Sequence, residues 1–254
     1  MHGSIKIIPI EGLPIITGPT DLSDILVTHF ASGHARLESK DILVLAHKIV
    51  SKAEGRVVDL RGITPGPSAL SIAGTSGRDA RLVEVILRES DEVVRAEGSH
   101  IIVRTRHGFI CANAGIDHSN VANSDDIVCL LPEAPDLSAE RIRKAIAAKL
   151  SASVAVLIID THGRPFRNGA VGVCIGCSGL NPLRSLVGQR DLFGYVMRSS
   201  VEAIADEVAA AATLSMGQCA EAVPAVVVRG LSCDAGEEPA TALVRHRSLD
   251  LFSR

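Results

Sequence analysis

Three polar segments of this chain carry side chains that could bind metal ions or phosphates: residues 112–121, 156–169 and 216–224. Each follows or closes a stretch of residues expected to form a strand or a helix. Binding groups of α/β proteins usually lie in loops at such ends. The three segments are therefore the candidate functional sites of this protein.

The first segment, residues 112–121, reads ANAGIDHSNV. Its small residues would let the backbone approach a ligand closely, and Asp117 and Asn120 would supply oxygen ligands. The same residues are typical of a turn in which Asp and Asn side chains cap their own backbone. Taken alone, the segment favours the turn.

The second segment places Asp160 after the apolar run 156–159, so its carboxylate is expected at a strand tip beside the Thr161 hydroxyl. Hard oxygen donors of this kind suit Mg²⁺ or Mn²⁺. Arg164 and Arg167 could hold anionic substrate groups or phosphates through their forked donors. The alternative is a turn capped by Asp160 with two solvated arginines. An acid at a strand tip, followed by two arginines and three turn residues, is a costly combination of residues for a loop without a function. We therefore favour the metal site.

The third segment runs from Met216 to Pro224, between a long helix and the last strong strand. Gly217 would allow the helix to stop and would leave Gln218 and Glu221 as possible ligands. Alone, the segment indicates only a helix C-terminus. Lys52 could pair with a phosphate as a point charge, although a single lysine is more often a surface residue.

Hydrophobic periodicity predicts a mixed α/β fold that positions these segments. Helices are expected after the N-cap candidates Thr20 and Asp21, over residues 79–89, after Ser138, and from Ser199 to about Met216. Residues 63–77 are rich in Pro, Gly and Ser and predict an irregular loop. Apolar runs predict strands over residues 5–10, 42–46, 101–103, 127–131, 154–159 and 225–228.

Composition and charge favour a small-molecule partner. Hydrophobic residues make up 46% of the 254 residues, enough for a substantial core, whereas aromatic residues make up 2% and cannot form a base-stacking surface. The net charge of -3 comes without a basic run, so nucleic-acid binding is not expected. No segment reads as a signal peptide or approaches the ~20 apolar residues of a membrane span, and a cytoplasmic protein is expected.

Common nucleotide and metal motifs are absent from the sequence. Neither a P-loop nor the glycine-rich turn of a Rossmann fold is present, so a nucleotide would be held in another way. Cys174 and Cys177 form a C-x-x-C pair without a second pair at zinc spacing. Buried, reduced thiols are the expected state of this pair.

Taken together, the segments resemble the coenzyme F-420 gamma-glutamyl ligases. The resemblance runs from about Ile5 to Phe252 in a single unit, residues 1–254, with no separate reductase domain expected. It rests on Leu13-Pro14, HKIVSKAEGR at 47–56, HGFICANAGID at 107–117, Ser119-Asn120-Val121, Asp160-Thr161, Gly163-Arg164-Pro165, Arg167-Asn168-Gly169 and Met216-Gly217-Gln218.

The resemblance implies GTP-dependent addition of L-glutamate, one or more residues through gamma linkages, to the deazaflavin precursor F-420-0. It also implies a two-lobed fold, an intertwined homodimer, two divalent ions (Mg²⁺ or Mn²⁺) and K⁺. Asp117, Asp160, Thr161 and Gln218 match the metal ligands of the family. Its GTP-contacting positions correspond to Leu13, Pro14, Ile15, Ile16, His47, Lys52, Asn120, Met216, Gly217, Gln218, Cys219, Ala220, Glu221, Ala222 and Val223.

Lys52, Arg164 and Arg167 are the residues expected to act on the reacting groups, with both arginines on the acidic tail of the substrate. His47, Ala220 and Ala222 depart from residues common in the family, so the nucleotide preference is less constrained than the reaction class. Two alternatives remain open. The acids could activate water in a metal-dependent phosphohydrolase, or the chain could be an inactive deazaflavin-binding module.

Overall fold

A five-stranded mixed sheet forms the centre of the computed structural model, which describes residues 4–33 and 35–251. Phe252, the last residue of the resemblance noted from the sequence, lies outside the described residues. The parallel pair in the sheet is β2 with β8, and the remaining neighbours are antiparallel. The predicted α/β fold is confirmed. The order across the sheet is β1 (Lys6–Pro9), β12 (Ala225–Arg229), β2 (Ile42–Ala46), β8 (Ala155–Arg164) and β9 (Arg167–Ser178).

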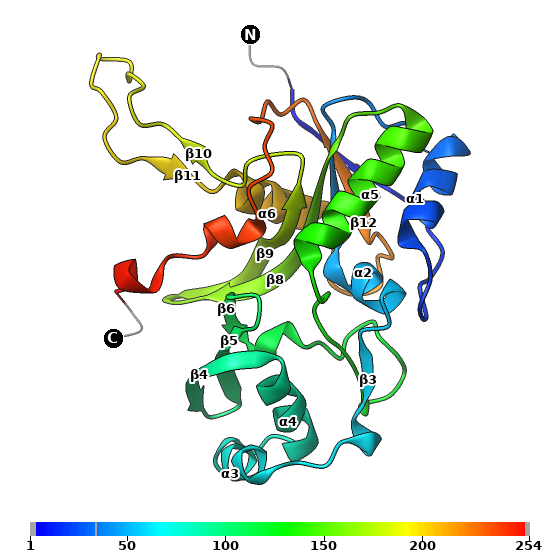
Figure 1. Ribbon diagram of the computed structural model, residues 1–254, viewed down its shortest axis with the longest axis vertical. Helices are drawn as coiled ribbons and strands as arrows, with labels where there is room; N and C mark the ends of the chain where they lie inside the picture. Colours follow the sequence, from blue (N-terminus) through cyan, green and yellow to red (C-terminus); the bar gives the residue numbers. More distant parts are fainter. Residues whose placement is uncertain (1–3, 34, 252–254) are drawn as a thin grey trace.

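Helices cover both faces of this sheet. Helices α1 (Leu22–Ala31) and α5 (Pro135–Leu150) pack together in front of it, whereas α6 (Ile204–Met216) lies behind (Figure 1). A strand covered on both faces has apolar side chains at every position. This explains the continuous aliphatic run of β2, whose first four side chains are all buried. We call the sheet and these helices, together with α2 (His47–Ala53), the large lobe.

A change of register in β9 lets a helix pack closely on each face of the strand. Opposite Ile158 and Ile159 the register of β9 shifts by one residue. A Cβ on Gly172 would overlap the backbone of Ala209 in α6, and a Cβ on Gly176 would overlap Pro135 in α5. Both glycines are therefore required by the close approach of a helix.

A second hydrophobic core lies in what we call the small lobe, at the bottom of Figure 1. Its buried side chains, such as Leu60, Val83 and Ile101, form a cluster separate from that of the large lobe. The elements of the small lobe are β3 (Val57–Asp59), α3 (Pro67–Ser76), α4 (Ala80–Arg88), β4 (Ser90–Glu97), β5 (His100–Thr105), β6 (Ile110–Ala112) and β7 (Ile127–Cys129).

A long hairpin formed by β10 (Arg184–Ser185) and β11 (Val201–Glu202) extends from the large lobe (Figure 1). Short 3-10 helices occupy Leu60–Gly62, Asn113–Gly115, Ala240–Leu243 and Arg247–Leu249. Within the described ranges, no helix combines the length and apolar character needed to cross a membrane.

Three predictions about helices were wrong. Residues 63–77 contain helix α3, because Pro67 occupies its first turn and Gly77 ends it in the left-handed conformation. Ser138 does not cap α5, which begins at Pro135; its hydroxyl instead donates to Glu54. Ser199 does not open α6, which begins at Ile204 after strand β11.

Candidate active site

A pocket of about 300 Å³ lies where β2 and α6 end, beside the middle of β8. Its walls come from segments far apart in the sequence, including the loop after β1, helix α2 and the loop after α6. All the sequence-predicted nucleotide positions line it: Leu13, Pro14, Ile15, Ile16, His47, Lys52, Asn120, Met216, Gly217, Gln218, Cys219, Ala220, Glu221, Ala222 and Val223. Asp160 and Thr161 line the same pocket.

The parallel pairing of β2 with β8 positions two polar residues of the pocket, His47 and Asp160. Ala46, the last residue of β2, pairs with Ile159, so His47 and Asp160 follow side by side. The expectation that Asp160 closes its strand was wrong, because β8 continues to Arg164 in a hairpin with β9. In the register of the sheet, Asp160 nonetheless lies one position beyond Ala46, the last residue of the neighbouring strand β2. Its carboxylate therefore borders the pocket from within a strand.

The loop after α6 takes its shape from Gly217, whose φ of 69° and ψ of −173° end the helix. The carboxylate of Glu221 folds back and accepts a 2.7 Å hydrogen bond from the backbone N–H of Cys219. The carbonyl of Cys219 accepts a 2.8 Å bond from the side-chain amide of Asn120. The loop is thus held from inside by Glu221 and from across the pocket by Asn120.

Asp117 enters the site through a turn of the small lobe. The N–H and hydroxyl of Ser119 donate to its Oδ1 at 2.7 and 2.9 Å, which is the self-capped turn considered from the sequence. Its Oδ2 lies 2.7 Å from the ammonium of Lys48. Burial alone would raise the pKa of Asp117, but the bonds from Lys48 and Ser119 outweigh burial and lower it. The structure thus contains the self-capped turn, and the carboxylate that caps it is the one predicted from the sequence to bind a metal ion.

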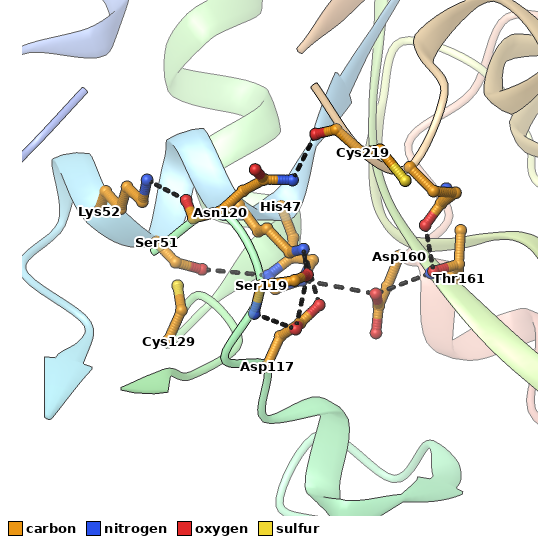
Figure 2. A network of polar contacts seen from close by, with 12 residues as sticks. His47, Ser51, Lys52, Asp117, Ser119, Asn120, Cys129, Asp160, Thr161 and Cys219 are labelled. Carbon is orange, nitrogen blue, oxygen red and sulfur yellow. Dashed lines mark hydrogen bonds and ion pairs between the residues drawn. The ribbon is translucent and has the colours of Figure 1, made fainter. Parts of the chain in front are cut away.

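Lys52 anchors the same loop one helical turn after Lys48. Its ammonium donates a 2.5 Å hydrogen bond to the carbonyl of Asn120, which has a φ of 56°. Burial lowers the pKa of Lys52. Figure 2 shows the resulting chain of contacts from α2 through the loop of the small lobe to Cys219.

Asp160 lies between two imidazoles. His47 Nε2 is 3.4 Å from Asp160 Oδ1, and His162 Nε2 is 3.0 Å from Asp160 Oδ2. Burial lowers the pKa of His47. Burial also opposes charge on His162, but hydrogen bonds with Asp160 and Cys111 raise its pKa to about 10. Burial alone would raise the pKa of Asp160 itself, but its interactions with His47, His162 and the N–H of Thr161 outweigh burial and lower it.

Hard oxygen donors predominate among the predicted metal ligands. The Thr161 hydroxyl donates to Gln218 Oε1 at 3.4 Å, and both residues line the pocket. Asp117 does not line the pocket itself but joins its wall through Lys48. In the described part of the chain, no group of three or more His, Cys, Asp and Glu side chains has the arrangement of a metal site. A cation here would use carboxylate, hydroxyl and amide oxygens together.

Two of the predicted catalytic residues lie elsewhere. Arg164 and Arg167 pair with each other at the turn of the β8–β9 hairpin and do not line the pocket. Sequence reasoning assigned no role to Lys48, although its spacing of four from Lys52 on a helix puts the two ammonium groups on one face. Cys174 and Cys177 are buried free thiols, as predicted.

Comparison with known proteins identifies the class. The profile of the family described as F420-0:Gamma-glutamyl ligase matches residues 12–230. The chain is 46% identical over 253 residues to a protein of Methanothermobacter thermautotrophicus named Coenzyme F420:L-glutamate ligase, covering 98% of each chain. A protein of the same name from Methanopyrus kandleri is 41% identical over 257 residues, covering 98% of this chain and 99% of the relative.

A third relative of that name, from Methanocaldococcus jannaschii, is 39% identical over 250 residues and covers 98% of this chain and 96% of its own length. The match therefore extends over both lobes and over every wall of the pocket. The chain belongs to the F420-0:Gamma-glutamyl ligase family.

Proposed function

We propose that this chain adds L-glutamate, one or more residues through gamma linkages, to the deazaflavin precursor F-420-0 at the expense of GTP. The observation that carries the proposal is the single pocket lined by every expected nucleotide position together with Asp160 and Thr161. The printed names of three relatives, each matching nearly the whole chain, support the same reaction.

The pocket suits a nucleoside triphosphate because its walls differ in character. Leu13, Ile15 and Ile16 provide an apolar side for a base, and Ile15 is 84% exposed. Lys48 and Lys52 provide ammonium groups for phosphate oxygens on another side. The polyphosphate would therefore extend toward Asp160 and Thr161. Guanine specificity is part of the proposal and rests on the family resemblance.

Divalent cations fit the oxygen donors of this site. Asp117, Asp160, Thr161 and Gln218 would hold Mg²⁺ or Mn²⁺, in keeping with the preference of these ions for hard oxygen ligands. Two divalent ions and K⁺ are proposed. When bound, such ions would neutralise the phosphate charge of the nucleotide. The 3.4 Å hydrogen bond from the Thr161 hydroxyl to Gln218 Oε1 supports the placement of these two donors at one site.

The proposed reaction has two steps. A carboxylate oxygen of F-420-0 attacks the γ-phosphorus of GTP, and the bond from that phosphorus to the β-phosphate oxygen breaks. GDP departs, and F-420-0 carries the phosphoryl group as an acyl phosphate. The amine of glutamate then attacks the acyl carbon, inorganic phosphate leaves, and the nitrogen loses a proton to form the amide. Lys52 would hold phosphate charge, and the site as a whole acts by positioning reactants and balancing charge.

Arg164 and Arg167 are proposed to bind the acidic tail of the deazaflavin substrate. The Arg164 Nε is buried and lacks a hydrogen-bond partner among the described residues, as expected of a group that awaits an anion. Forked guanidinium donors suit carboxylates and phosphates. The hairpin turn that carries both residues would then extend the substrate site outward from Asp160, a pocket residue in strand β8.

A homodimer is also proposed. The tip of the β10–β11 hairpin exposes Leu192 and Phe193 at 98% and 95%, with Tyr195 nearby at 55%. Large apolar groups gathered on an extended hairpin are typical of a protein interface. Light scattering should give twice the mass of the chain. The double change Leu192→Ser and Phe193→Ser should shift the protein toward the monomer. A dimer of unchanged stability would show that the hairpin is not part of the interface.

Mass spectrometry tests the proposed reaction directly. F-420-0 incubated with the protein, GTP, glutamate and Mn²⁺ should gain mass in steps of one glutamyl unit, and omission of any one reactant should abolish the gain. Asp160→Asn is the inactive control. GTP hydrolysis that needs neither glutamate nor F-420-0 would identify a phosphohydrolase. Binding of F-420-0 without any nucleotide turnover would identify a non-catalytic module.

A further inference from the structure

The ion pair between Lys48 and Asp117 has no role in the reaction proposed above. Lys48 lies at the start of α2, and its ammonium donates to Asp117 Oδ2 and to Ser119 Oγ, both at 2.7 Å. Its side chain is 21% exposed and lines the same pocket as Lys52. The ammonium is therefore fixed between a proposed metal ligand and the nucleotide pocket.

Both oxygens of the Asp117 carboxylate have partners in this arrangement. Its Oδ1 accepts two hydrogen bonds from Ser119, and its Oδ2 faces Lys48. A divalent cation approaching Oδ2 would meet an ammonium 2.7 Å from the same oxygen, and like charges at such a separation in a half-buried site repel strongly. Cation and ammonium therefore compete for one carboxylate.

The nucleotide would remove this competition. Lys48 and Lys52 lie four residues apart on α2, so both point to one side of the helix, where the pocket lies. The lysine stem is long and flexible, and its ammonium can change partners by rotation of side-chain bonds alone. Phosphate oxygens entering the pocket would offer that ammonium a new partner and release Asp117.

We propose that Lys48 is an internal counter-ion that keeps Asp117 closed to a divalent cation until the phosphates of a nucleotide draw the ammonium away. Binding of the metal ion to this site is then conditional on the nucleotide. By thermodynamic reciprocity, the metal ion strengthens nucleotide binding to the same degree. The inference rests on the proposed function, since it takes the cation and the nucleotide of that proposal as its ligands.

Titration of the nucleotide-free protein with Mn²⁺, followed by electron paramagnetic resonance, measures the competition without turnover. Lys48→Met removes the ammonium and keeps an apolar stem. We expect its Kd for Mn²⁺ to fall about 5- to 150-fold below that of the unaltered protein, the usual range of coupling between two ligands. Lys48→Gln, a second neutral change, should behave in the same way and provides the same test if the Met variant folds poorly.

Two control variants locate the effect. Lys144→Met removes a lysine that pairs with Glu140 on the exposed surface of α5, so it makes the same change in net charge and should leave the Kd unchanged. The double change Lys48→Met with Asp117→Asn should lose the gain in affinity, because the carboxylate released by the first change is neutralised by the second.

A Kd for Mn²⁺ that is equal or weaker in both Lys48 variants would overturn the inference, as would an equal gain in Lys144→Met. The glutamyl-transfer assay separates this outcome from failure of the proposed function. Product formed by the unaltered protein without a gain in the Lys48 variants defeats the counter-ion alone. A gain in Mn²⁺ affinity without any product leaves the counter-ion in place and defeats the ligase.

Discussion

Replacing Gly217 by alanine should damage the pocket through the backbone. Gly217 combines a φ of 69° with a ψ of −173°, a region that is essentially restricted to glycine. A Cβ at this position would also lie 2.2 to 2.5 Å from three side-chain atoms of Glu221. The side chain of Glu221 would have to leave the N–H of Cys219, and the loop would lose the bond that shapes it.

The magnitude follows from the strain. Holding a residue with a Cβ in such a region costs about 1–3 kcal/mol. If the loop relaxes to relieve that strain, the same free energy is lost from nucleotide binding, which corresponds to an affinity lower by roughly 5- to 150-fold. If the loop stays in place, the loss appears instead in the free energy of unfolding.

Two measurements on the same variant capture either outcome: calorimetric titration with a non-hydrolysable GTP analogue and urea unfolding. Gly74→Ala is the matched control, because Gly74 lies in α3 with no atom within 4 Å of an added Cβ, and alanine favours a helix. The reasoning is refuted if Gly217→Ala matches the unaltered protein in both measurements.

Three further predictions concern stability and substrate binding. His162 has a pKa of about 10 when folded and 6.5 as the reference, so its contribution to stability is complete below pH 6.5 and disappears as the pH rises through 10. His162→Gln should therefore flatten the fall in the free energy of unfolding of metal-free protein between pH 7 and 10, and an unchanged slope would contradict the pKa. Leu157→Ala, in a fully buried position of β8, should cost about 2–5 kcal/mol in urea unfolding, and a loss below 1 kcal/mol would contradict tight packing there. Changing Arg164 and Arg167 together to alanine should raise the apparent KM for F-420-0 without changing binding of the GTP analogue; unaltered turnover and KM would exclude the proposed tail site.

Elements governed by local pattern could be predicted from the sequence. The four aliphatic residues that open β2 leave few alternatives to a strand buried on both faces, and the structure has that strand at Ile42–Ala46. Helix α3 escaped prediction because its Pro and Gly residues count as breakers of regular structure. Pro67 and Gly77 in fact mark the two ends of the helix. Their position relative to the apolar residues was the signal that could have revealed it.

The site shows a different limit. The family resemblance correctly assigned distant segments of the chain to one site, but it did not predict which side chains are in contact there. The contact of Lys48 with Asp117 joins a helix of the large lobe to a turn of the small lobe, and no periodicity specifies such a pair. The continuation of β8 past Asp160 was missed for a similar reason. Residues 160–164 are polar, and their strand structure depends on pairing with β9.

The separation of the two hydrophobic cores has a mechanical consequence. Polar contacts join the two lobes beside the pocket. They link Asp117, Ser119 and Asn120 of the small lobe to Lys48, Lys52 and Cys219 of the large lobe. Any movement of one lobe against the other would change these contacts beside the pocket. A ligand that bound in the pocket and contacted both lobes would therefore restrain their relative movement.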